Sequence, residues 1–420
     1  MSSHKALRIA YFAEIFPSKS ETWIHHEIDQ LRALGCEVRV FATHPRPDNL
    51  ASEFQRFAEL TTYLPEQVRS VVAGLREIAH RSLLLPVIKG LFTGAPALRL
   101  KAQILRDLMY TGLLFPHVQR FKPDILFAHF GASRTNMAMF HSLLTGKPFA
   151  FQMHAADVFT RVAILQLKSA LAKRVGTISR FNLDFMRKSY PDIDVSRFTI
   201  HKCGLPLGTF DYAPKSTLHS PPRLVSVGRM VRTKGFEVLI RASCEMNRRG
   251  LTHSLVIIGD GPQRPELEGL IDSLGLRETI RLPGYCSPGD VQRALREADA
   301  FVLPVVWDPI LNIPEGVPVA LMEAMAMGLP VVSARTAGIP ELIEDGINGF
   351  LAKPGDSTDL ATVIGRLFEL PDSERTKITQ AAREKIVADH DIEKLTKDLY
   401  FSLLKLAVNE ASHPVILEKG

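Results

Sequence analysis

The sequence is poor in the features that mark a metal-binding or disulfide-rich protein. Its 420 residues include four cysteines, Cys36, Cys203, Cys244 and Cys286, and no two of them have the Cys-x-x-Cys spacing. Zinc sites and disulfide frameworks need clustered or regularly spaced cysteines. The sequence therefore predicts neither, and it fits the reducing conditions of the cytoplasm.

Long hydrophobic runs are also missing. No stretch approaches the roughly 18 apolar residues of a membrane-spanning helix. The apolar run near the N-terminus is interrupted by Glu14. It is too short for a secretory signal and is more typical of a first β-strand. We therefore expect a protein that is not integral to a membrane.

Size and composition indicate an ordinary globular protein with more than one core. Hydrophobic residues make up 46% of the chain and charged residues 23%, which is typical of folded domains. A chain of this length exceeds the size at which a single core stops growing, so we expect two domains of roughly 200 residues each.

Positive charge is distributed unevenly. Residues 1–212 carry 27 Lys and Arg against 17 Asp and Glu, and residues 213–420 carry 24 against 28. Such asymmetry indicates an anionic partner, either nucleic acid or a membrane surface. No basic stripe interleaved with aromatic residues is present, so we expect no nucleic-acid partner.

The segment 68–106 suggests where a membrane surface would bind. It mixes Leu, Val and Ile with Arg and Lys and contains one acidic residue, Glu77. A basic amphipathic surface of this kind can rest on anionic lipid. Helices packed on the domain with their basic faces in solvent would give the same pattern, and both interpretations stay open.

Short apolar runs alternate with helical patterns in both halves of the chain. The first half has such runs at 7–12, 37–43, 124–130, 148–154 and 175–179, and the second at 223–229, 254–261, 279–285, 299–306 and 330–334. This alternation predicts parallel strands joined by helices. We expect two doubly wound α/β domains, with a ligand in the cleft at the carboxyl ends of both sheets.

The proline-rich segment 211–222 interrupts this rhythm and is predicted to be a linker. It divides the chain into an N-terminal domain, 1–212, and a C-terminal domain, 213–390. The helical pattern at 391–408 is expected to begin a C-terminal segment, 391–420, that crosses back onto the first domain.

Two loops of the second half carry residues suited to a phosphate ligand. Arg229 and Lys234 follow a strand, and a guanidinium and an ammonium held together there can bind a diphosphate. Gly259 and Gly261 lie just before a helix, but Arg264 occupies the third glycine position of the dinucleotide fingerprint. A dehydrogenase is therefore not indicated, and either a nucleotide-facing loop or an ordinary strand-to-helix turn fits.

Two acids, Glu315 and Glu323, lie eight positions apart in an apolar run that is predicted to become helical near Val317 or Pro318. Eight positions span at most roughly 12 Å along a helix. The acid pair of a glycosidase is roughly 5 to 9.5 Å apart. We therefore expect the two acids to contact different parts of an extended ligand rather than one bond.

Two histidines end strands of the first half, and an aspartate follows one of them. His154 and His129 follow apolar runs, and Asp157 lies three residues after His154. A strand-end histidine can act in a site or simply cap a loop. Asp157 can orient His154 or cap the next helix, and the residues alone do not separate these roles.

Together these motifs resemble the retaining glycosyltransferases of family 4, which have the GT-B fold of two Rossmann-like domains. "VGRMVRTKG", "VIIGDGP", the Glu-x7-Glu segment and "GLPVVSARTAGIPELIEDGINGFL" occur in order in the second half. In the first half, "PSKSETW", "AHFG" and "HAADVF" are similar to the branch that acts in exopolysaccharide and colanic-acid-type assembly.

The resemblance implies a metal-independent hexosyltransferase that needs no cofactor and uses a UDP- or GDP-sugar as donor. The acceptor, a glycan or lipid-linked oligosaccharide, would bind the N-terminal domain, and the enzyme would be cytoplasmic, with a peripheral membrane contact through that domain. Arg229 and Lys234 would bind the donor diphosphate, Glu315 and His154 the donor sugar, and Glu323 the ribose. Further donor-binding positions would be Gly259, Gly261, Gly284, Tyr285, Gly316, Val317 and Pro318.

Transfer is expected to retain the configuration of the sugar, because no second carboxylate is placed to act as a nucleophile. Asp-x-Asp pairs occur at 192–194 and 389–391, far from the donor motifs, so no metal site is expected. A nucleotide-sugar epimerase of the same fold is the alternative activity.

The sequence departs from the family pattern in two places. The loop after the first strand lacks the usual glycine-rich turn, although Ser18 and Glu21 fit a capping box that would preserve the helix start. The segment "VWDPILNIPEG" is longer than usual, and its Asp308 could contact sugar or turn the chain.

Overall fold

The computed structural model describes residues 6–18, 21–46, 52–64, 98–160, 162–215, 217–308, 310–311 and 313–411. The chain divides into two compact units. Unit 1 comprises Met1–Ile178, Asn182–Lys202 and Ile392–Gly420, and unit 2 comprises Ser179–Phe181 and Cys203–Asp391. Most of the predicted basic segment, 68–97, lies outside the described residues, and 98–106 begins helix α5.

Each unit is built on one parallel sheet. In unit 1 the strands are β1 (Arg8–Ala13), β2 (Glu37–Ala42), β3 (Thr61–Tyr63), β4 (Ile125–His129), β5 (Phe149–Met153), β6 (Arg174–Thr177) and β7 (Phe198–Ile200). In unit 2 they are β8 (Arg223–Val227), β9 (Ser254–Ile258), β10 (Ile280–Gly284), β11 (Ala300–Leu303), β12 (Val331–Ala334) and β13 (Phe350–Ala352).

The α-helices complete both units. They are α1 (Thr22–Ala33), α2 (Ser52–Glu59), α5 (Leu98–Phe121), α6 (Ser133–Thr145), α7 (Ala156–Phe159), α8 (Leu165–Leu171), α9 (Arg180–Ser189), α10 (Phe236–Arg248), α11 (Arg264–Ser273), α12 (Pro288–Glu297), α13 (Val319–Ala326), α14 (Ile339–Leu342), α15 (Ser357–Glu369), α16 (Asp372–Asp389) and α17 (Ile392–Ala411).

The strand order of each sheet reverses once. Unit 1 has the order β3-β2-β1-β4-β5-β6-β7, and unit 2 has β10-β9-β8-β11-β12-β13. Neighbouring strands pair in parallel. The order reverses between β1 and β4 and between β8 and β11. Ligands of doubly wound folds bind at the carboxyl ends of the strands at such switch points.

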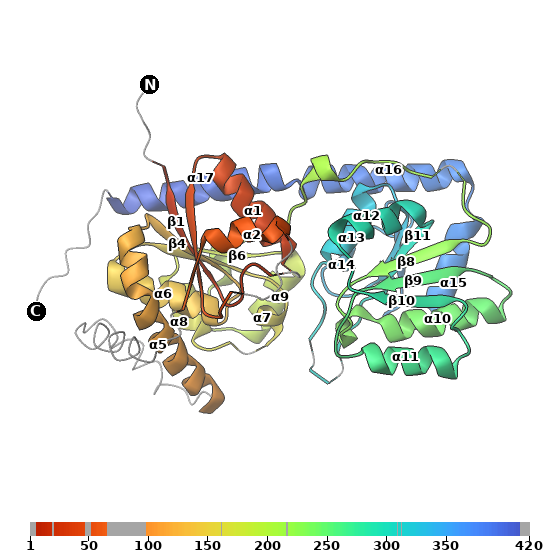
Figure 1. The fold of residues 1–420 in the computed structure, drawn as a ribbon, viewed down its shortest axis with the longest axis horizontal. Helices are drawn as coiled ribbons and strands as arrows, with labels where there is room; N and C mark the ends of the chain where they lie inside the picture. Colours follow the sequence, from red (N-terminus) through yellow and green to blue (C-terminus); the bar gives the residue numbers. More distant parts are fainter. Residues whose placement is uncertain are drawn as a thin grey trace, which may run out of the picture. The chain divides into compact units, whose positions relative to one another are not determined.

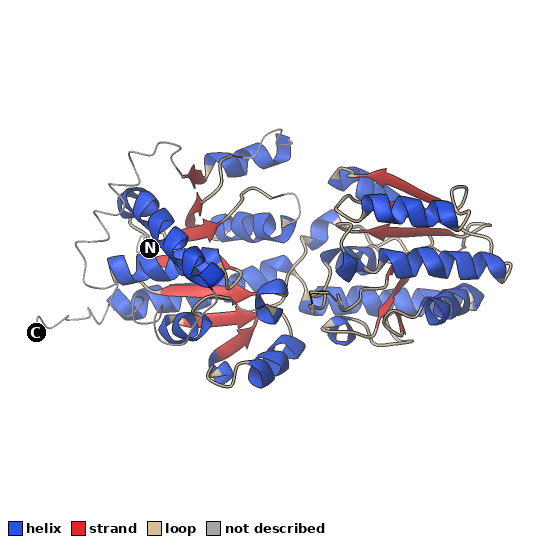
Figure 2. Cartoon of the chain, turned by 90° about the horizontal axis from the view of Figure 1, so that it is seen from below, coloured by secondary structure: helices blue, strands red, loops and turns tan. Residues whose placement is uncertain are grey.

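The central strands are mostly apolar because helices cover both faces of each sheet. Every residue of β4, β5, β11 and β12 is buried. Helices α5, α6 and α8 lie on one face of the first sheet, and α1 and α17 on the other (Figure 1). Figure 2 shows the strands enclosed between helices in each unit. The doubly wound α/β class predicted from the sequence is confirmed.

The chain passes from unit 1 to unit 2 at Cys203, eight residues before the predicted linker begins at Asp211. Leu205 already donates a backbone hydrogen bond to the carbonyl of His390 at 2.7 Å, and Phe210 is buried in the core of unit 2. The segment 211–222 packs on the same unit, since Ala213 N donates to Met327 O at 3.1 Å. The prolines therefore belong to unit 2 and do not form a free linker. Helix α17 then packs on α1 and β4 of unit 1.

Within the residues that the structure describes, no helix is both long enough and apolar enough to span a lipid bilayer.

Candidate active site

The loop between β8 and α10 carries three basic side chains at the switch point of unit 2, and two of them, Arg229 and Lys234, are the predicted phosphate-binding residues. Arg229 comes two residues after β8, and Lys234 ends a 3-10 turn, Arg232–Lys234, just before α10. Arg229 is exposed, and no carboxylate in the described part of the chain pairs with its guanidinium. Its charge is available to an anionic ligand.

Lys234 is held by Glu315, the first of the two predicted acids. The Lys234 Nζ lies 3.2 Å from Glu315 Oε2. The same oxygen accepts a hydrogen bond from Thr233 Oγ1 at 2.8 Å, and Glu315 Oε1 accepts one from Gly316 N at 3.3 Å. Glu315 comes from the loop after β11 and Lys234 from the loop after β8, so the pair spans the switch point.

Helix α13 begins after the second predicted donor-binding stretch. Pro318 is its N-cap, one position before the first helical residue, Val319, and makes no side-chain capping bond. The helix start therefore lies one or two residues later than predicted. Val317 packs against the core of unit 2. The first N–H groups of a helix need partners outside it, and an anion can supply them.

Glu323, the second acid, lies on α13 among apolar neighbours. Leu321, Met322, Ala324 and Met325 are buried, and burial raises the pKa of Glu323 to about 7. No described residue hydrogen-bonds or pairs with its carboxyl group. A half-buried acid among apolar side chains is costly unless a partner hydrogen-bonds it, and the hydroxyls of a bound ligand can be that partner.

Gly259 and Gly261 let the loops after β8 and β9 touch. Gly259 has φ 136°, and a Cβ there would collide with the Gly228 carbonyl oxygen. A Cβ at Gly261 would lie 2.6 Å from the Met230 carbonyl oxygen. Close backbone packing therefore requires both glycines, and the same packing fixes the loop that carries Arg229. This favours the strand-to-helix turn that the sequence left as one of two alternatives.

Gly284 and Tyr285 end the next strand of the same sheet. The Gly284 carbonyl accepts a hydrogen bond from Gly259 N at 2.9 Å, and Tyr285 is 54% exposed. Five predicted positions of unit 2, at 229, 259, 261, 284 and 285, therefore lie on three adjoining loops at the carboxyl edge of the sheet.

In unit 1 the two predicted histidines contact each other. His129, the last residue of β4, places Nδ1 2.9 Å from Nε2 of His154, which follows β5. His129 Nε2 lies 2.9 Å from Glu27 Oε1, and Tyr11 Oη donates to the same oxygen at 3.0 Å. The result is a buried chain of polar groups at the switch point of unit 1.

Burial and neighbouring charges determine the protonation states of Glu27 and His154. Burial alone would raise the pKa of Glu27, but the charge and hydrogen bond of His129, with those of His201, hold it well below its usual value. Burial, followed by the charge of His129, holds the pKa of His154 well below that of a free histidine. Glu27 is ionised and His154 neutral at neutral pH.

Asp157 lies where it can order the backbone around His154. Its Oδ1 accepts from His154 N at 3.0 Å and its Oδ2 from Gly131 N at 2.6 Å. Burial raises the pKa of Asp157, and these backbone bonds oppose that shift. Asp157 acts on the main chain and not on the imidazole, so it fixes the loops after β4 and β5.

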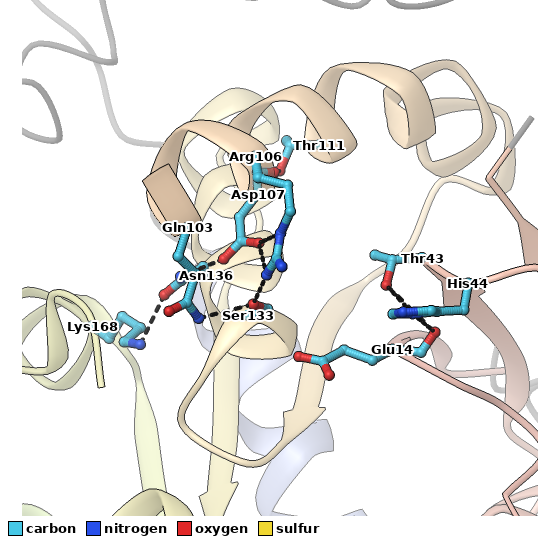
Figure 3. Close-up of polar contacts among 10 residues, drawn as sticks. All are labelled: Glu14, Thr43, His44, Gln103, Arg106, Asp107, Thr111, Ser133, Asn136 and Lys168. Atoms are coloured by element: carbon cyan, nitrogen blue, oxygen red, sulfur yellow. Dashed lines mark hydrogen bonds and ion pairs between the residues drawn. The ribbon is translucent and has the colours of Figure 1, made fainter. Parts of the chain in front are cut away.

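A second buried network supports the loop after β4 (Figure 3). Lys168 Nζ, from α8, donates to the Gly131 carbonyl and, at 2.8 Å, to Asn136 Oδ1 on α6. Asn136 Nδ2 in turn donates to Asp107 Oδ2 on α5 at 2.7 Å. Burial lowers the pKa of Lys168 to about 7, although Asp107 and Asp157 oppose the shift. The network ties three helices to the site.

The loop after β1 differs from the sequence expectation. Helix α1 starts at Thr22, and its N-cap residue, Glu21, makes no side-chain capping bond. The predicted capping box is therefore wrong, because the Glu21 carboxylate instead binds Arg134 at 2.9 and 3.0 Å. Glu14 in this loop accepts through its carbonyl from His44 Nδ1 at 3.1 Å (Figure 3).

Asp308 turns the chain. Its Oδ1 accepts from the backbone N–H groups of Ile310 and Leu311 at 2.8 and 3.0 Å, and the side chain is buried. The Asp308 carboxylate binds backbone N–H groups of its own loop. Of the two roles that the sequence allowed, this favours turning the chain over contacting sugar.

The two Asp-x-Asp pairs do not combine into a cluster. Asp194 caps a 3-10 turn by accepting from Ser196 N, and Asp389 pairs with Lys385 at 2.8 Å. Among the described residues, no group of three or more His, Cys, Asp or Glu side chains could hold a metal ion.

Sequence reasoning missed Glu27 and Tyr11. One signal was available for Glu27. In α1, Trp23, Ile24, Ile28 and Leu31 form the buried face, and Glu27 lies four residues from both Trp23 and Leu31. An acid at the centre of a buried stripe needs a polar partner from elsewhere in the fold. The sequence could not show that His129 is that partner.

The chain is similar to known glycosyltransferases. Residues 211–385 match the family model of glycosyl transferases group 1. The chain is 28% identical over 407 residues to the putative colanic acid biosynthesis glycosyltransferase WcaL of Escherichia coli (strain K12), covering 94% of this chain and 98% of that protein. It is 29% identical over 397 residues to the amylovoran biosynthesis glycosyltransferase AmsK of Erwinia amylovora, covering 90% and 95%.

A solved structure shares the fold. Anabaena HepE, in complex with UDP and glucose, matches with a TM-score of 0.69 at 17% identity, covering 95% of this chain and 100% of that chain. The family model and both relatives are glycosyltransferases, so the epimerase alternative finds no support. The comparisons therefore support a glycosyltransferase of the GT-B fold, whose residues 211–385 match the glycosyl transferases group 1 family.

Proposed function

We propose that the protein is a retaining glycosyltransferase that moves a hexose from a nucleotide-diphosphate sugar to a glycan or lipid-linked acceptor in exopolysaccharide biosynthesis. Two relatives that align over nearly the whole chain carry names from colanic acid and amylovoran biosynthesis, and this supports the pathway class. A lipid pyrophosphate carrier is the acceptor form that suits such assembly.

The observation that carries the proposal is the charged group at the switch point of unit 2. Two cations, Arg229 and Lys234, and two acids, Glu315 and Glu323, lie on the loops after β8 and β11 and on α13. Only Lys234 and Glu315 pair with each other. A nucleotide sugar needs cations for its diphosphate and acceptors for its hydroxyls, and this set supplies both.

Each residue then has a role that follows from its surroundings. The exposed Arg229 binds the diphosphate. Lys234 adds a positive point charge that stabilises the diphosphate as it leaves the sugar. Glu315 accepts from hydroxyls of the donor sugar, and Glu323 accepts from the ribose diol. In unit 1, His154 contributes a hydrogen bond to the donor sugar.

The transfer step requires no enzyme nucleophile. The bond between the sugar anomeric carbon and the phosphate oxygen breaks, and the acceptor hydroxyl forms its bond on the same face. The departing phosphate oxygen takes the hydroxyl proton, so charge and protons balance. NMR of the first product should show the configuration of the donor, and an inverted product would contradict this route.

Donor identity is the first thing to measure. We expect one class of UDP- or GDP-sugar to raise the melting temperature, because a ligand bound only to the folded state stabilises it. ADP-sugars serve as the comparison. HepE was solved with UDP, so UDP-sugars are the first to try. No shift with any nucleotide sugar, together with no transfer to a lipid-linked acceptor, would contradict the proposed function.

A cytoplasmic enzyme that meets its acceptor at the membrane would use the basic half of the chain. The excess of Lys and Arg in residues 1–212 supports this part of the proposal. We expect binding to anionic vesicles that weakens as salt rises. Absence of binding, or binding that ignores ionic strength, would remove the electrostatic contribution.

A further inference from the structure

Glu27 and His129 lie behind His154 and have no assigned role. Both are buried, as is His154 itself. Trp23 encloses the two imidazoles, with ring centroids 4.6 Å from His129 and 4.4 Å from His154. An ionised carboxylate in such surroundings is kept only where hydrogen bonds compensate its lost hydration. Glu27 receives bonds from His129 and Tyr11 on one oxygen, and His201 Nε2 lies 3.8 Å from the other.

The direction of the hydrogen bonds follows from Glu27. A carboxylate only accepts, so the proton of the 2.9 Å contact is carried by His129 Nε2. When His129 is a neutral imidazole, its Nδ1 is an acceptor and receives the proton of His154 Nε2 across 2.9 Å, whereas an imidazolium would donate there instead. With Nε2 protonated, Nδ1 of His154 is an acceptor nitrogen.

The backbone also fixes the two rings. Phe130, next to His129, has φ 68°, an uncommon conformation for a bulky residue, and its ring centroid lies 4.7 Å from that of His154. Such conformations persist where the surroundings determine them and are enriched at functional sites. Asn182 Nδ2 donates to the His154 carbonyl, and Asp157 accepts from its N–H.

From this geometry we propose that Glu27 and a neutral His129 are positioning residues that hold His154 as its Nε2–H tautomer, so that Nδ1 accepts a hydrogen bond from a hydroxyl of the donor sugar. The inference rests on the proposed function for the sugar contact. The tautomer itself is a property of the ligand-free chain. Neither Glu27 nor His129 touches the substrate in this account.

The tautomer can be read directly by NMR of the full chain labelled with ¹⁵N-histidine. The resonances of His154 are identified as those lost in His154→Gln. We expect a protonated Nε2 and an unprotonated Nδ1 in the wild-type protein. A His154 that carries its proton on Nδ1 would overturn the proposal, because His129 would then be the donor to it.

The Glu27→Gln variant distinguishes a role of Glu27 in orienting His154 from a role in packing alone. The amide has nearly the same shape as the carboxylate, but it can donate as well as accept hydrogen bonds. The direction of the hydrogen bonds from Glu27 through His129 to His154 is then no longer fixed. We expect both tautomers of His154 to appear and kcat to fall by about 10-fold or more, which is the effect of removing groups that orient metal-binding histidines. The KM for the donor should change much less. An unchanged His154 spectrum in this variant would overturn the proposal.

A matched control is available in the same unit. His141 on α6 is as buried as His129, but its Nδ1 bonds the backbone carbonyl of Met137 at 2.9 Å. His141→Gln should leave the His154 spectrum and kcat unchanged, whatever it costs in stability. A loss of kcat equal to that of Glu27→Gln would mean that any buried polar change in this unit lowers activity, and would overturn the positioning role.

Two variants of His129 test the positioning role independently if Glu27→Gln fails to fold. His129→Gln retains one donor and one acceptor, whereas His129→Phe retains only the ring. We expect the Gln variant to keep at least about 10-fold more activity than the Phe variant. The reverse order would overturn the proposal.

Failure of the proposed function looks different. If His154→Ala transfers sugar at the wild-type rate, the sugar contact is wrong, while the NMR result still decides the tautomer. If His154→Ala is inactive but wild-type His154 carries its proton on Nδ1, the proposed function stands and the positioning role is wrong.

Discussion

The carboxyl group of Glu323 lies in surroundings that disfavour its charge, and this makes stability depend on pH. Its pKa is about 7 in the folded protein, against about 4.3 in an unfolded chain. Below pH 4 both states are protonated. Between pH 4.3 and 7 only the unfolded state ionises, so stability falls as pH rises, and the loss is complete above 7. We expect a loss on the order of 2 kcal/mol after allowing for partial exposure.

Glu323→Gln should therefore flatten the decline in melting temperature between pH 5 and 8 and stabilise the ligand-free protein at pH 8. The same change should weaken donor binding, because the amide is a poorer acceptor for a diol. Glu237→Gln, an exposed acid of α10, is the control and should leave the pH dependence as it is. A Glu323→Gln protein that loses stability with pH as steeply as the wild type would count against the assigned origin of the shift.

Arg229 offers a test of how the diphosphate is held. Arg229→Lys keeps the charge but loses the planar fork that binds phosphate oxygens in pairs. We expect kcat/KM to fall about 10-fold in Arg229→Lys and about 100-fold or more in Arg229→Ala. Arg241→Ala removes an exposed arginine of α10 that pairs with Glu237 at 2.9 Å, and should change kcat/KM little. Equal activity of the Arg229 and Arg241 variants would contradict the diphosphate role.

At the level of single residues, the sequence predicted the groups that end strands. His129 and His154 were found because apolar runs end at them, and Arg229 because it follows a strand. Glu27 was not found because it sits within a helix, and its partner is 102 positions away. Pairing across such a separation depends on strand order, which periodicity does not reveal.

At the level of elements, two glycines of the same loop–helix unit make opposite predictions. A Cβ at Gly259 would collide with the Gly228 carbonyl, whereas a Cβ at Gly269 on α11 meets nothing within 4 Å. Gly259→Ala should cost about 2 kcal/mol or more, because the loops after β8 and β9 must separate. Gly269→Ala should stabilise α11 by about 0.5–1 kcal/mol.

Thermal unfolding of both proteins measures the difference. The Gly259 variant should also lose donor affinity, since the same loops hold Arg229, while the Gly269 variant should bind the donor as the wild type does. If Gly259→Ala were as stable as the wild type, the glycine would not be required by packing, and a direct role toward the nucleotide would become the better explanation.

Elements were predictable where one physical signal dominates. Buried strands such as β4 and β11 are continuous apolar runs, and their parallel pairing follows from the helices between them. Boundaries were less predictable where several signals compete. The capping box at Ser18 failed because Arg134, more than 100 positions away, binds Glu21 instead. The predicted linker failed because its prolines pack on unit 2, which proline content does not distinguish from a free segment.

At the level of the whole molecule, the proposed reaction depends on how the charge of the leaving diphosphate is neutralised. In the proposed reaction, Arg229 contacts the diphosphate, and the uncapped start of α13 adds backbone N–H groups. Lys234, which pairs with Glu315 in the free protein, is expected to join them once a sugar hydroxyl binds Glu315 in its place. If these protein groups are sufficient, the enzyme needs no divalent cation. Initial transfer rates should then be unchanged, within about twofold, when EDTA is added.

Testing divalent cations on Arg229→Ala as well as on the wild type makes the experiment more decisive. Arg229→Ala removes protein charge at the diphosphate, so added Mg²⁺ or Mn²⁺ could substitute for it in part and should raise the variant's rate more than the wild-type rate. In the wild type we expect the guanidinium to occupy that position already, so the same cations should have little effect. A wild-type enzyme that is inactive in EDTA and restored by Mg²⁺ or Mn²⁺ would show that protein groups alone do not neutralise the leaving group, and the roles assigned to Arg229 and Lys234 would have to be revised.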